Sequence, residues 1–295
     1  MATEIDPRSA FFEGSLHNPT HRQKAVNAIK SGQPIVMMFR GTFGIAGDGS
    51  NDTFVNSVVE IKGAGRHGAP LAALYSAEKL VTMIDTTQLP PSHWITNADE
   101  IRSRLSTLCF VRVPIKKEAA ETLPSSMVSY SADGLPILQN WFPHGLPVES
   151  VTECIEHPAV TSTNYHGEPE IIEPDMVAAF CVKTNIPVFL RDETYPLRGV
   201  KGSYTIFSIG KNGIQAVREG NIPVDTFKYI FGDKIDKKET VPAKHPQLKI
   251  PSELLEGLTP PQVREAIIHY TEGRFPRRVE HIRRKVTKGT RGHKN

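Results

Sequence analysis

Apolar positions along this chain alternate between helical spacing and short continuous runs, which predict interleaved helices and strands. A helix is predicted over residues 20–30, where Ala25, Val26 and Ile29 share one face. The continuous apolar run 34–39 that follows is typical of a buried strand. The same two patterns predict further strands over 71–75, 108–113 and 187–190, and further helices after Ser76 and over 148–156 and 175–184.

A hairpin and a late helix complete the pattern. Residues 204–209 and 214–218 predict two paired strands around the turn Gly210-Lys211-Asn212-Gly213. Further on, Thr259 has the position of a helix N-cap, and Gln262 completes a capping box with it. A helix is therefore predicted directly after Thr259.

These elements divide the chain into four parts. Interleaved helices and strands indicate a mixed α/β domain, after which charge and proline content rise and periodicity fades. The predicted parts are an N-terminal arm (1–19), an α/β domain (20–225), a linker (226–258) and a helix with a basic tail (259–295).

Composition limits the class of protein. The 295 residues are 39% hydrophobic and 23% charged, as in soluble globular proteins. No apolar run reaches the roughly 18 residues of a membrane span, and residues 1–18 carry acids and prolines where a signal peptide would be apolar. We therefore expect a cytoplasmic protein with no membrane partner. Cys109, Cys154 and Cys181 are widely separated among apolar neighbours, which predicts buried free thiols.

Positive charge is concentrated at the C-terminus. Residues 274–295 contain nine Lys and Arg against the single acid Glu280, so they carry +8 of a chain whose net charge is +3. Such a tail could contact RNA, including double-stranded RNA, through its phosphates. A helix that docks on a partner and a solvated chain end are the alternatives.

The strongest candidate for chemistry is the polar segment Thr161-Ser162-Thr163-Asn164-Tyr165-His166-Gly167-Glu168-Pro169. In an extended chain Ser162 and Asn164 point to the same side, so both reach one ligand. We interpret this segment as a binding edge rather than a core strand; an ordinary polar loop is the alternative. A glycine-rich loop is predicted over residues 41–49, without the spacing of a Rossmann or Walker motif.

This polar segment is similar to the T-S-A-N-x-S-G-E-P motif of the YrdC-like family, whose best-known members are threonylcarbamoyl-AMP synthases. Two shorter segments support the resemblance, which covers roughly residues 20–225. Thr42-Phe43-Gly44-Ile45 is similar to the family's T-V-Y-G-L, and Val217-Arg218-Glu219-Gly220-Asn221-Ile222 is similar to its L-R-E-G-A-I.

The resemblance implies a YrdC-like α/β fold, with a twisted open mixed sheet, flanking helices and a central cavity, followed here by a short helical basic C-terminal extension. It also implies that ATP, with Mg²⁺, reacts with bicarbonate and L-threonine to give a carbamoyl-type adenylate and pyrophosphate, and that the product serves tRNA modification. The nucleotide-binding residues that it implies are Lys62, Arg66, Ser162, Asn164 and Arg218.

The chain departs from the family where the amino acid would bind. Phe39 replaces a family threonine, Arg40 replaces an acid, and Lys62 lies four positions before Arg66 instead of two. The arginine of the family's V-R-x-P motif is expected near residues 128–131, which contain none. The substrate-binding residues implied here are Phe39, Arg40, Thr42, Thr107, Tyr130 and Thr205.

Three functions remain open from the sequence. The first is a YrdC-like nucleotidyltransferase with a changed acceptor, because a site that loses its hydrogen-bonding groups discriminates strongly against its former substrate. The second is a non-catalytic protein that binds a nucleotide or RNA. The third is an adenylation enzyme that uses carbamoyl phosphate in place of bicarbonate.

Overall fold

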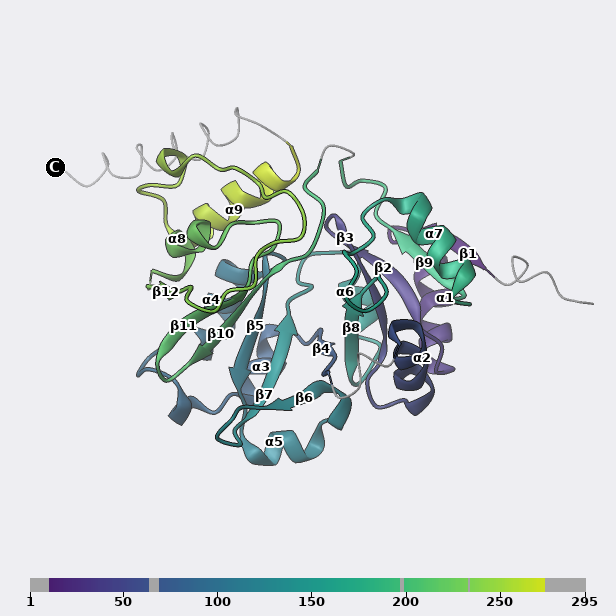
Figure 1. Ribbon diagram of the computed structural model, residues 1–295, viewed down its shortest axis with the longest axis horizontal. Helices are drawn as coiled ribbons and strands as arrows, with labels where there is room; N and C mark the ends of the chain where they lie inside the picture. Colours follow the sequence, from purple (N-terminus) through teal and green to yellow (C-terminus); the bar gives the residue numbers. More distant parts are fainter. Residues whose placement is uncertain (1–10, 64–68, 197–198, 233, 274–295) are drawn as a thin grey trace, which may run out of the picture.

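A mixed twelve-stranded sheet forms the centre of the molecule in the computed structural model, which describes residues 11–63, 69–196, 199–232 and 234–273 (Figure 1). In spatial order its strands are β1 (Phe12–Ser15), β9 (Val188–Arg191), β2 (Ile35–Phe39), β3 (Thr42–Asp48), β8 (Pro158–Ser162), β4 (Ala72–Ala73), β7 (Pro136–Trp141), β5 (Cys109–Pro114), β10 (Thr205–Gly210), β11 (Gly213–Arg218) and β12 (Ile235–Asp236), with β6 (Val128–Tyr130) also paired to β7. The predicted mixed α/β fold with an open sheet is confirmed.

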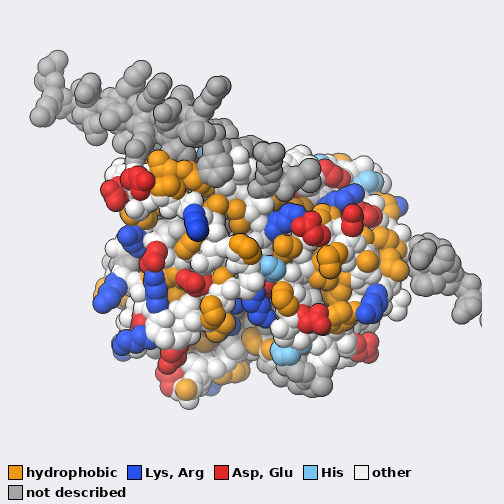
Figure 2. All heavy atoms as spheres, turned by 45° about the horizontal axis from the view of Figure 1, so that its top comes forward, with side chains coloured by type: hydrophobic (Ala, Val, Ile, Leu, Met, Phe, Trp, Pro, Cys, Tyr) orange, Lys and Arg blue, Asp and Glu red, His pale blue; other side chains and the backbone are white. Residues whose placement is uncertain are grey.

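Helices surround this sheet, and most of them lie toward its two ends (Figure 1). In chain order they are α1 (Pro19–Lys30), α2 (Asp52–Lys62), α3 (Ala77–Met83), α4 (Ala98–Leu105), α5 (Lys117–Thr122), α6 (Glu149–Thr152), α7 (Pro174–Lys183), α8 (Lys228–Phe231) and α9 (Pro260–Thr271). Helices α1 and α7 pack against β9, whereas α4, α8 and α9 pack against one another at the end where β10 and β11 lie. Figure 2 shows the molecule with the top of Figure 1 turned forward, and acidic, basic and apolar side chains are interspersed on this face.

Local signals place most of the predicted elements correctly. The predicted helix over 20–30 corresponds to α1, and the hairpin over 204–218 to β10 and β11. The capping box of α9 is present, with the Thr259 amide donating to Oε1 of Gln262 at 2.9 Å. The predicted helix over 148–156 is confined to the short α6.

The glycine-rich loop predicted over residues 41–49 is wrong, because β3 occupies most of it. Two glycines permit this strand to pack closely against its neighbours. A Cβ on Gly44 would lie 2.5 Å from Cγ2 of Val160, and one on Gly47 would lie 2.3 Å from the ring of Phe54. The glycines therefore serve close packing within the sheet rather than turning of the chain.

The binding edge predicted around Ser162 also needs correction. Strand β8, which Ser162 ends, lies in the interior of the sheet between β3 and β4. The polar segment thus begins where a core strand stops. Pairing on both sides fixes the position of its first residues.

Both parts that flank the predicted domain contact it. From the N-terminal arm, β1 pairs in parallel with β9. From the predicted linker, the Leu248 amide donates to the Asn221 carbonyl at 2.8 Å, and Gln247 donates to the Gly220 carbonyl at 3.2 Å. The linker segment is therefore held against the residues that follow β11.

Two further sequence expectations can be compared with the structure. Cys109 and Cys181 are buried free thiols as predicted, and burial raises the pKa of Cys181 to about 12. Cys154 is a free thiol but is exposed, so its predicted burial is wrong. Within the described residues, no helix is both long enough and apolar enough to cross a membrane.

Candidate functional site

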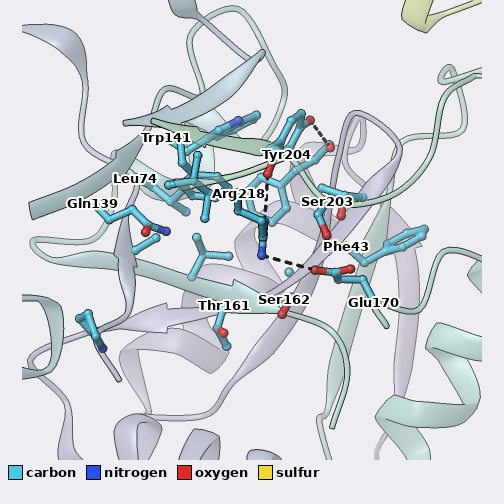
Figure 3. Close-up of a pocket in the computed structure, with 18 of the residues that line it drawn as sticks. Phe43, Leu74, Gln139, Trp141, Thr161, Ser162, Glu170, Ser203, Tyr204 and Arg218 are labelled. Atoms are coloured by element: carbon cyan, nitrogen blue, oxygen red, sulfur yellow. Dashed lines mark hydrogen bonds and ion pairs between the residues drawn. The ribbon is translucent and has the colours of Figure 1, made fainter. Parts of the chain in front are cut away.

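A cavity of about 270 Å³ lies against the central strands of the sheet (Figure 3). Eight strands contribute to its lining: β2, β3, β4, β5, β7, β8, β10 and β11. Its polar groups include Ser162 from β8, Gln139 from β7 and Arg218 from β11, whose side chains Figure 3 shows around one space. Aromatic rings make up much of the rest of the lining.

Lys62, Ser162 and Asn164 form one hydrogen-bonded cluster beside this cavity. Lys62 is the last residue of α2 and is only 5% exposed. Its ammonium group donates to the Ser162 carbonyl and to Oδ1 of Asn164, and it lies 3.3 Å from Oγ of Ser162. The Ser162 hydroxyl in turn donates to Oδ1 of Asn164 at 2.6 Å. The structure therefore brings together three of the residues implied by the resemblance.

The amide group of Asn164 extends this cluster into the following turn. Its Nδ2 donates to the Glu168 carbonyl at 2.6 Å, so Asn164 organises the backbone as well as facing Lys62. Ser162 lines the cavity, whereas Lys62 and Asn164 contact Ser162 without lining the cavity themselves. Arg66, the fourth of the implied nucleotide-binding residues, lies outside the described residues.

Arg218, at the end of β11, points into the cavity (Figure 3). One terminal nitrogen donates to the Tyr204 carbonyl at 2.9 Å, and the other lies 3.7 Å from a carboxylate oxygen of Glu170. Burial lowers the pKa of the Arg218 guanidinium, and the charge of Glu170 opposes that shift. The backbone contact and the acid together hold the cation at the cavity.

Glu170 is the acidic side chain of the cavity lining, and its neighbours favour the ionised form. Burial by itself would raise the pKa of this carboxyl, but a hydrogen bond with Ser203 and the charges of Arg218 and His245 bring the pKa below its ordinary value. His245 belongs to the predicted linker, and its Nε2 lies 3.5 Å from Oε2 of Glu170. The linker thus reaches the charged group of the cavity.

A second cation in the cavity, Arg112 on β5, was not among the residues expected from the sequence. Its Nε donates to Oε1 of Gln139 at 2.8 Å across the antiparallel pair of β5 and β7. Burial, and then the like charge of Arg218, lower the pKa of Arg112. The sequence contains a signal for Arg112, because Val111-Arg112-Val113-Pro114 matches the V-R-x-P motif. We expected that motif further along the chain, near residues 128–131.

Four aromatic residues form one wall of the cavity, which we call the aromatic wall: Phe39, Phe110, Trp141 and Tyr204. The ring of Trp141 lies 5.4 Å from those of both Phe39 and Tyr204, and Phe110 lies 6.1 Å from Tyr204. The Tyr204 hydroxyl donates to the Phe39 carbonyl at 2.6 Å, which ties two members together (Figure 3). Only Phe39 was expected at the site from the sequence.

The remaining residues expected at the acceptor lie in different places. Thr42 lines the cavity opposite Phe39 in the hairpin of β2 and β3. Arg40 is not among the lining residues; it has a positive φ of 43° and pairs with Glu272 at 2.6 Å, just after α9. Its guanidinium therefore joins the β2–β3 turn to the C-terminal helix.

Three others also lie outside the lining. Tyr130, on β6, is 67% exposed. Thr107 is buried just before β5 with a φ of 69°. Thr205 is buried and donates to the Ile222 carbonyl at 2.6 Å while accepting from the Gly220 amide at 3.1 Å. The hydroxyl of Thr205 thus supports the turn after Arg218.

Comparison with solved structures identifies the architecture. A variant of Sua5 from P. abyssi matches with a TM-score of 0.56 and 18% identity, over 76% of this chain and 62% of that one. A hypothetical protein from Streptococcus mutans UA159 matches with a TM-score of 0.54 and 15% identity, over 80% of this chain and 98% of that one. E. coli YciO matches with a TM-score of 0.51 and 14% identity, over 71% of this chain and 95% of that one.

Comparisons by sequence give no match: no family model matches this chain, and no curated protein does. Sua5 from P. abyssi has also been crystallised with L-threonine, and that structure matches with a TM-score of 0.53 and 15% identity over 64% of its length. The likeness therefore spans under two thirds of Sua5. The arrangement of strands and helices is what these proteins have in common, and on that ground this chain has the YrdC-like fold.

Proposed function

We propose that the protein is an ATP-dependent synthase that converts a carbamoylated amino acid into its adenylate and releases pyrophosphate. One observation carries this proposal: the Ser162 hydroxyl and the Arg218 guanidinium line one cavity in a YrdC-like fold. A neighbour of the same fold, Sua5, binds L-threonine in its crystal structure. The proposal extends that kind of chemistry to this chain.

The reaction balances with bicarbonate as the source of the carbamoyl carbon. The amine of the amino acid attacks bicarbonate with loss of water and gives a carbamate. An oxygen of that carbamate attacks the α-phosphorus of ATP, and the bond to pyrophosphate breaks. Negative charge builds up on the departing pyrophosphate, where a cation fixed in advance stabilises the transition state more than the ground state.

The residues of the cavity have distinct parts in this scheme. Arg218 would pair with phosphate oxygens, and the Ser162 hydroxyl would donate to one of them. Lys62 and Asn164 would hold Ser162 in position through the cluster described above. Mg²⁺, when bound with ATP, neutralises phosphate charge, and Glu170 is the carboxylate of the lining. Arg66 remains a predicted contributor.

Pyrophosphate release tests this proposal directly. The full chain is assayed with ATP, Mg²⁺, bicarbonate and a panel of amino acids, and a non-hydrolysable ATP analogue is titrated in parallel. We expect release that depends on both bicarbonate and one class of amino acid. Arg218→Gln should weaken analogue binding about 10–100-fold, since it removes a charge-assisted pair. Arg191→Gln, on β9 outside the cavity lining, is the matched control.

Two other results would replace the proposal. Release with carbamoyl phosphate but not with bicarbonate would indicate an enzyme that receives a preformed carbamoyl group. Analogue binding without any release would indicate a non-catalytic nucleotide-binding protein, and RNA binding by residues 274–295 would then be tested next. The use of the product in tRNA modification would follow only if threonine is the acceptor.

A further inference from the structure

Glu170 and Arg218 present a hydrogen-bond acceptor and a donor side by side in the cavity (Figure 3). Oε1 of Glu170 lies 3.7 Å from Nη1 of Arg218, beyond the roughly 3.2 Å of a direct N–H···O hydrogen bond. The other terminal nitrogen of Arg218 is held by the Tyr204 carbonyl. A ligand group that both donates and accepts can therefore bridge the two side chains.

Both side chains also keep unused hydrogen-bonding capacity. Within the part of the chain that the structure describes, Oε2 of Glu170 accepts no hydrogen bond and Nε of Arg218 donates none. His245 lies 3.5 Å from Oε2 without forming a hydrogen bond to it. Because Glu170 is only 7% exposed, an incompletely bonded carboxylate is costly here, and a donor on a ligand would remove that cost.

The backbone places Glu170 close to Ser162. Glu170 directly follows the polar segment 161–169, and both side chains line the cavity (Figure 3). The Ile171 amide donates to the Thr163 carbonyl at 2.9 Å, so the segment folds back on itself and brings its two ends together. A ligand group that contacts Glu170 therefore lies near the group that contacts Ser162.

The charges of this pair limit the class of ligand group. Burial by itself would raise the pKa of the Glu170 carboxyl, but the hydrogen bond with Ser203 and the charges of Arg218 and His245 keep that pKa below its ordinary value. An ionised carboxylate repels phosphate oxygens, and a guanidinium repels an ammonium group. A hydroxyl is neutral, donates to the carboxylate and accepts from the guanidinium. The pair is therefore suited to a hydroxyl group.

In ATP the hydroxyl groups next to the phosphates are those of ribose. The sugar is bonded directly to the α-phosphate, so phosphates held by Ser162 and Arg218 bring the sugar to the edge of the same site. Its two hydroxyls are on adjacent carbons and point the same way, as the acceptor and the donor of this pair do. A carboxylate is the group that binds the ribose hydroxyl in many dinucleotide-binding proteins.

We propose that Glu170 is the ribose-binding residue of the nucleotide site, with its carboxylate accepting from a ribose hydroxyl and Nη1 of Arg218 donating to the sugar. This inference rests on the proposed function and specifies how its site recognises the nucleotide. The Ser162 hydroxyl and the remaining N–H groups of Arg218 take the phosphates. The site therefore selects ribonucleotides over deoxyribonucleotides.

Nucleotides that lack ribose hydroxyls test this on the unaltered full chain. ATP, 2′-deoxy-ATP, 3′-deoxy-ATP and 2′,3′-dideoxy-ATP are titrated by calorimetry with Mg²⁺, and without amino acid or bicarbonate so that no turnover occurs. The dideoxynucleotide should bind about 10–100-fold more weakly than ATP, the effect of losing hydrogen bonds to a charged group. The two single deoxynucleotides identify the hydroxyl that Glu170 binds. Equal affinity for ATP and the dideoxynucleotide would overturn the proposal.

Replacing Glu170 assigns the discrimination to this side chain. Glu170→Ala should weaken ATP binding about 10–100-fold and change binding of 2′,3′-dideoxy-ATP by less than about threefold, so that the two nucleotides bind alike. Glu168→Ala removes the same side chain at an exposed position nearby and should keep the preference for ATP. An undiminished preference for ATP in Glu170→Ala would show that another group binds the sugar.

Inorganic tripolyphosphate distinguishes sugar binding from a general loss of structure. It has the phosphates of ATP but no sugar, and in Glu170→Ala it no longer meets a repelling carboxylate. Its affinity should stay the same or rise, while that for ATP falls. A parallel loss of both affinities would contradict the proposal.

Repeating the ATP titrations with EDTA in place of Mg²⁺ tests a metal-binding role for Glu170. The preference for ATP over the dideoxynucleotide should persist without the metal. If the effect of Glu170→Ala disappears with Mg²⁺, the carboxylate is a metal ligand and its assignment to ribose is wrong.

These titrations measure binding alone, so they separate this inference from the proposed function. A preference for ATP that depends on Glu170, without pyrophosphate release with any amino acid, would support the ribose contact and exclude the synthase. Pyrophosphate release with equal use of ATP and its dideoxy form would support the synthase and overturn the ribose contact.

Discussion

The ammonium group of Lys62 donates to the carboxamide oxygen of Asn164, which lies 102 residues further along the chain. This contact joins the end of α2 to the segment that follows β8, and it sets the position of Ser162 at the cavity. Because Lys62 is almost fully buried, its hydrogen bonds are shielded from water. The cluster is therefore both a part of the site and a part of the fold.

Replacing Lys62 should affect stability and nucleotide binding together. Lys62→Met removes the donor to two oxygens, and we expect the free energy of unfolding to fall by about 1–3 kcal/mol. Urea denaturation measures this loss. Lys30→Met, an exposed position at the end of α1, is the matched control and should change stability by less than about 0.5 kcal/mol. Equal effects of the two substitutions would mean that the buried cluster adds no stability.

Gly44 is predicted to tolerate no side chain. In Gly44→Ala the added Cβ would lie 2.5 Å from Val160 and 2.9 Å from Phe39, and both neighbours line the cavity. We expect a loss of about 1–3 kcal/mol in unfolding free energy, as in other overpacked cores. Gly210→Ala provides the control, since open space surrounds that position. Thermal unfolding of the two variants distinguishes crowding from the general effect of an added methyl group.

Glu170 should make stability depend on acid pH. Its pKa in the folded state is below the ordinary value of 4.5, so its contribution is present above about pH 4.5 and is lost as pH falls through the lowered pKa. Glu170→Gln should therefore lose stability less steeply than the wild type over that acid range. Unfolding free energies between about pH 3 and pH 7 provide the measurement. Glu168→Gln makes the same change at an exposed position and is the matched control.

Arg40 is predicted to act on stability rather than on the acceptor. Its ion pair with Glu272 is largely buried and holds the end of α9 to the β2–β3 turn. Arg40→Gln should cost about 1–3 kcal/mol of unfolding free energy. The KM for the acceptor should stay the same, because the side chain does not line the cavity. An increase in KM at unchanged stability would instead support the role first expected from the sequence.

The sequence predicts best where a local signal decides the structure. The capping box at Thr259 places the start of α9, and the apolar face of Ala25, Val26 and Ile29 places α1. Ser162 and Asn164 do come together with Lys62, as the resemblance implies. The first two features depend on residues close together in the chain, whereas the third joins distant segments and was implied only by the family's motifs.

The rest depends on contacts between distant segments, which spacing in one sequence does not reveal. Gly44 and Gly47 look like loop residues until Val160 and Phe54 are seen against them. Arg112 enters the site because β5 pairs with β7, and its partner Gln139 has no local signal. Arg40 lies outside the cavity lining because its side chain pairs with Glu272, which is far along the chain.

The pairing of β1 with β9 has a consequence for synthesis of the chain. Residues 12–15 are synthesised long before their partner strand, which ends at Arg191. Strand β1 therefore has no partner until β9 has been made. Pairings between such distant segments close large loops and slow folding. We expect β1 to be one of the last strands to join the sheet, and only after β9 has been synthesised.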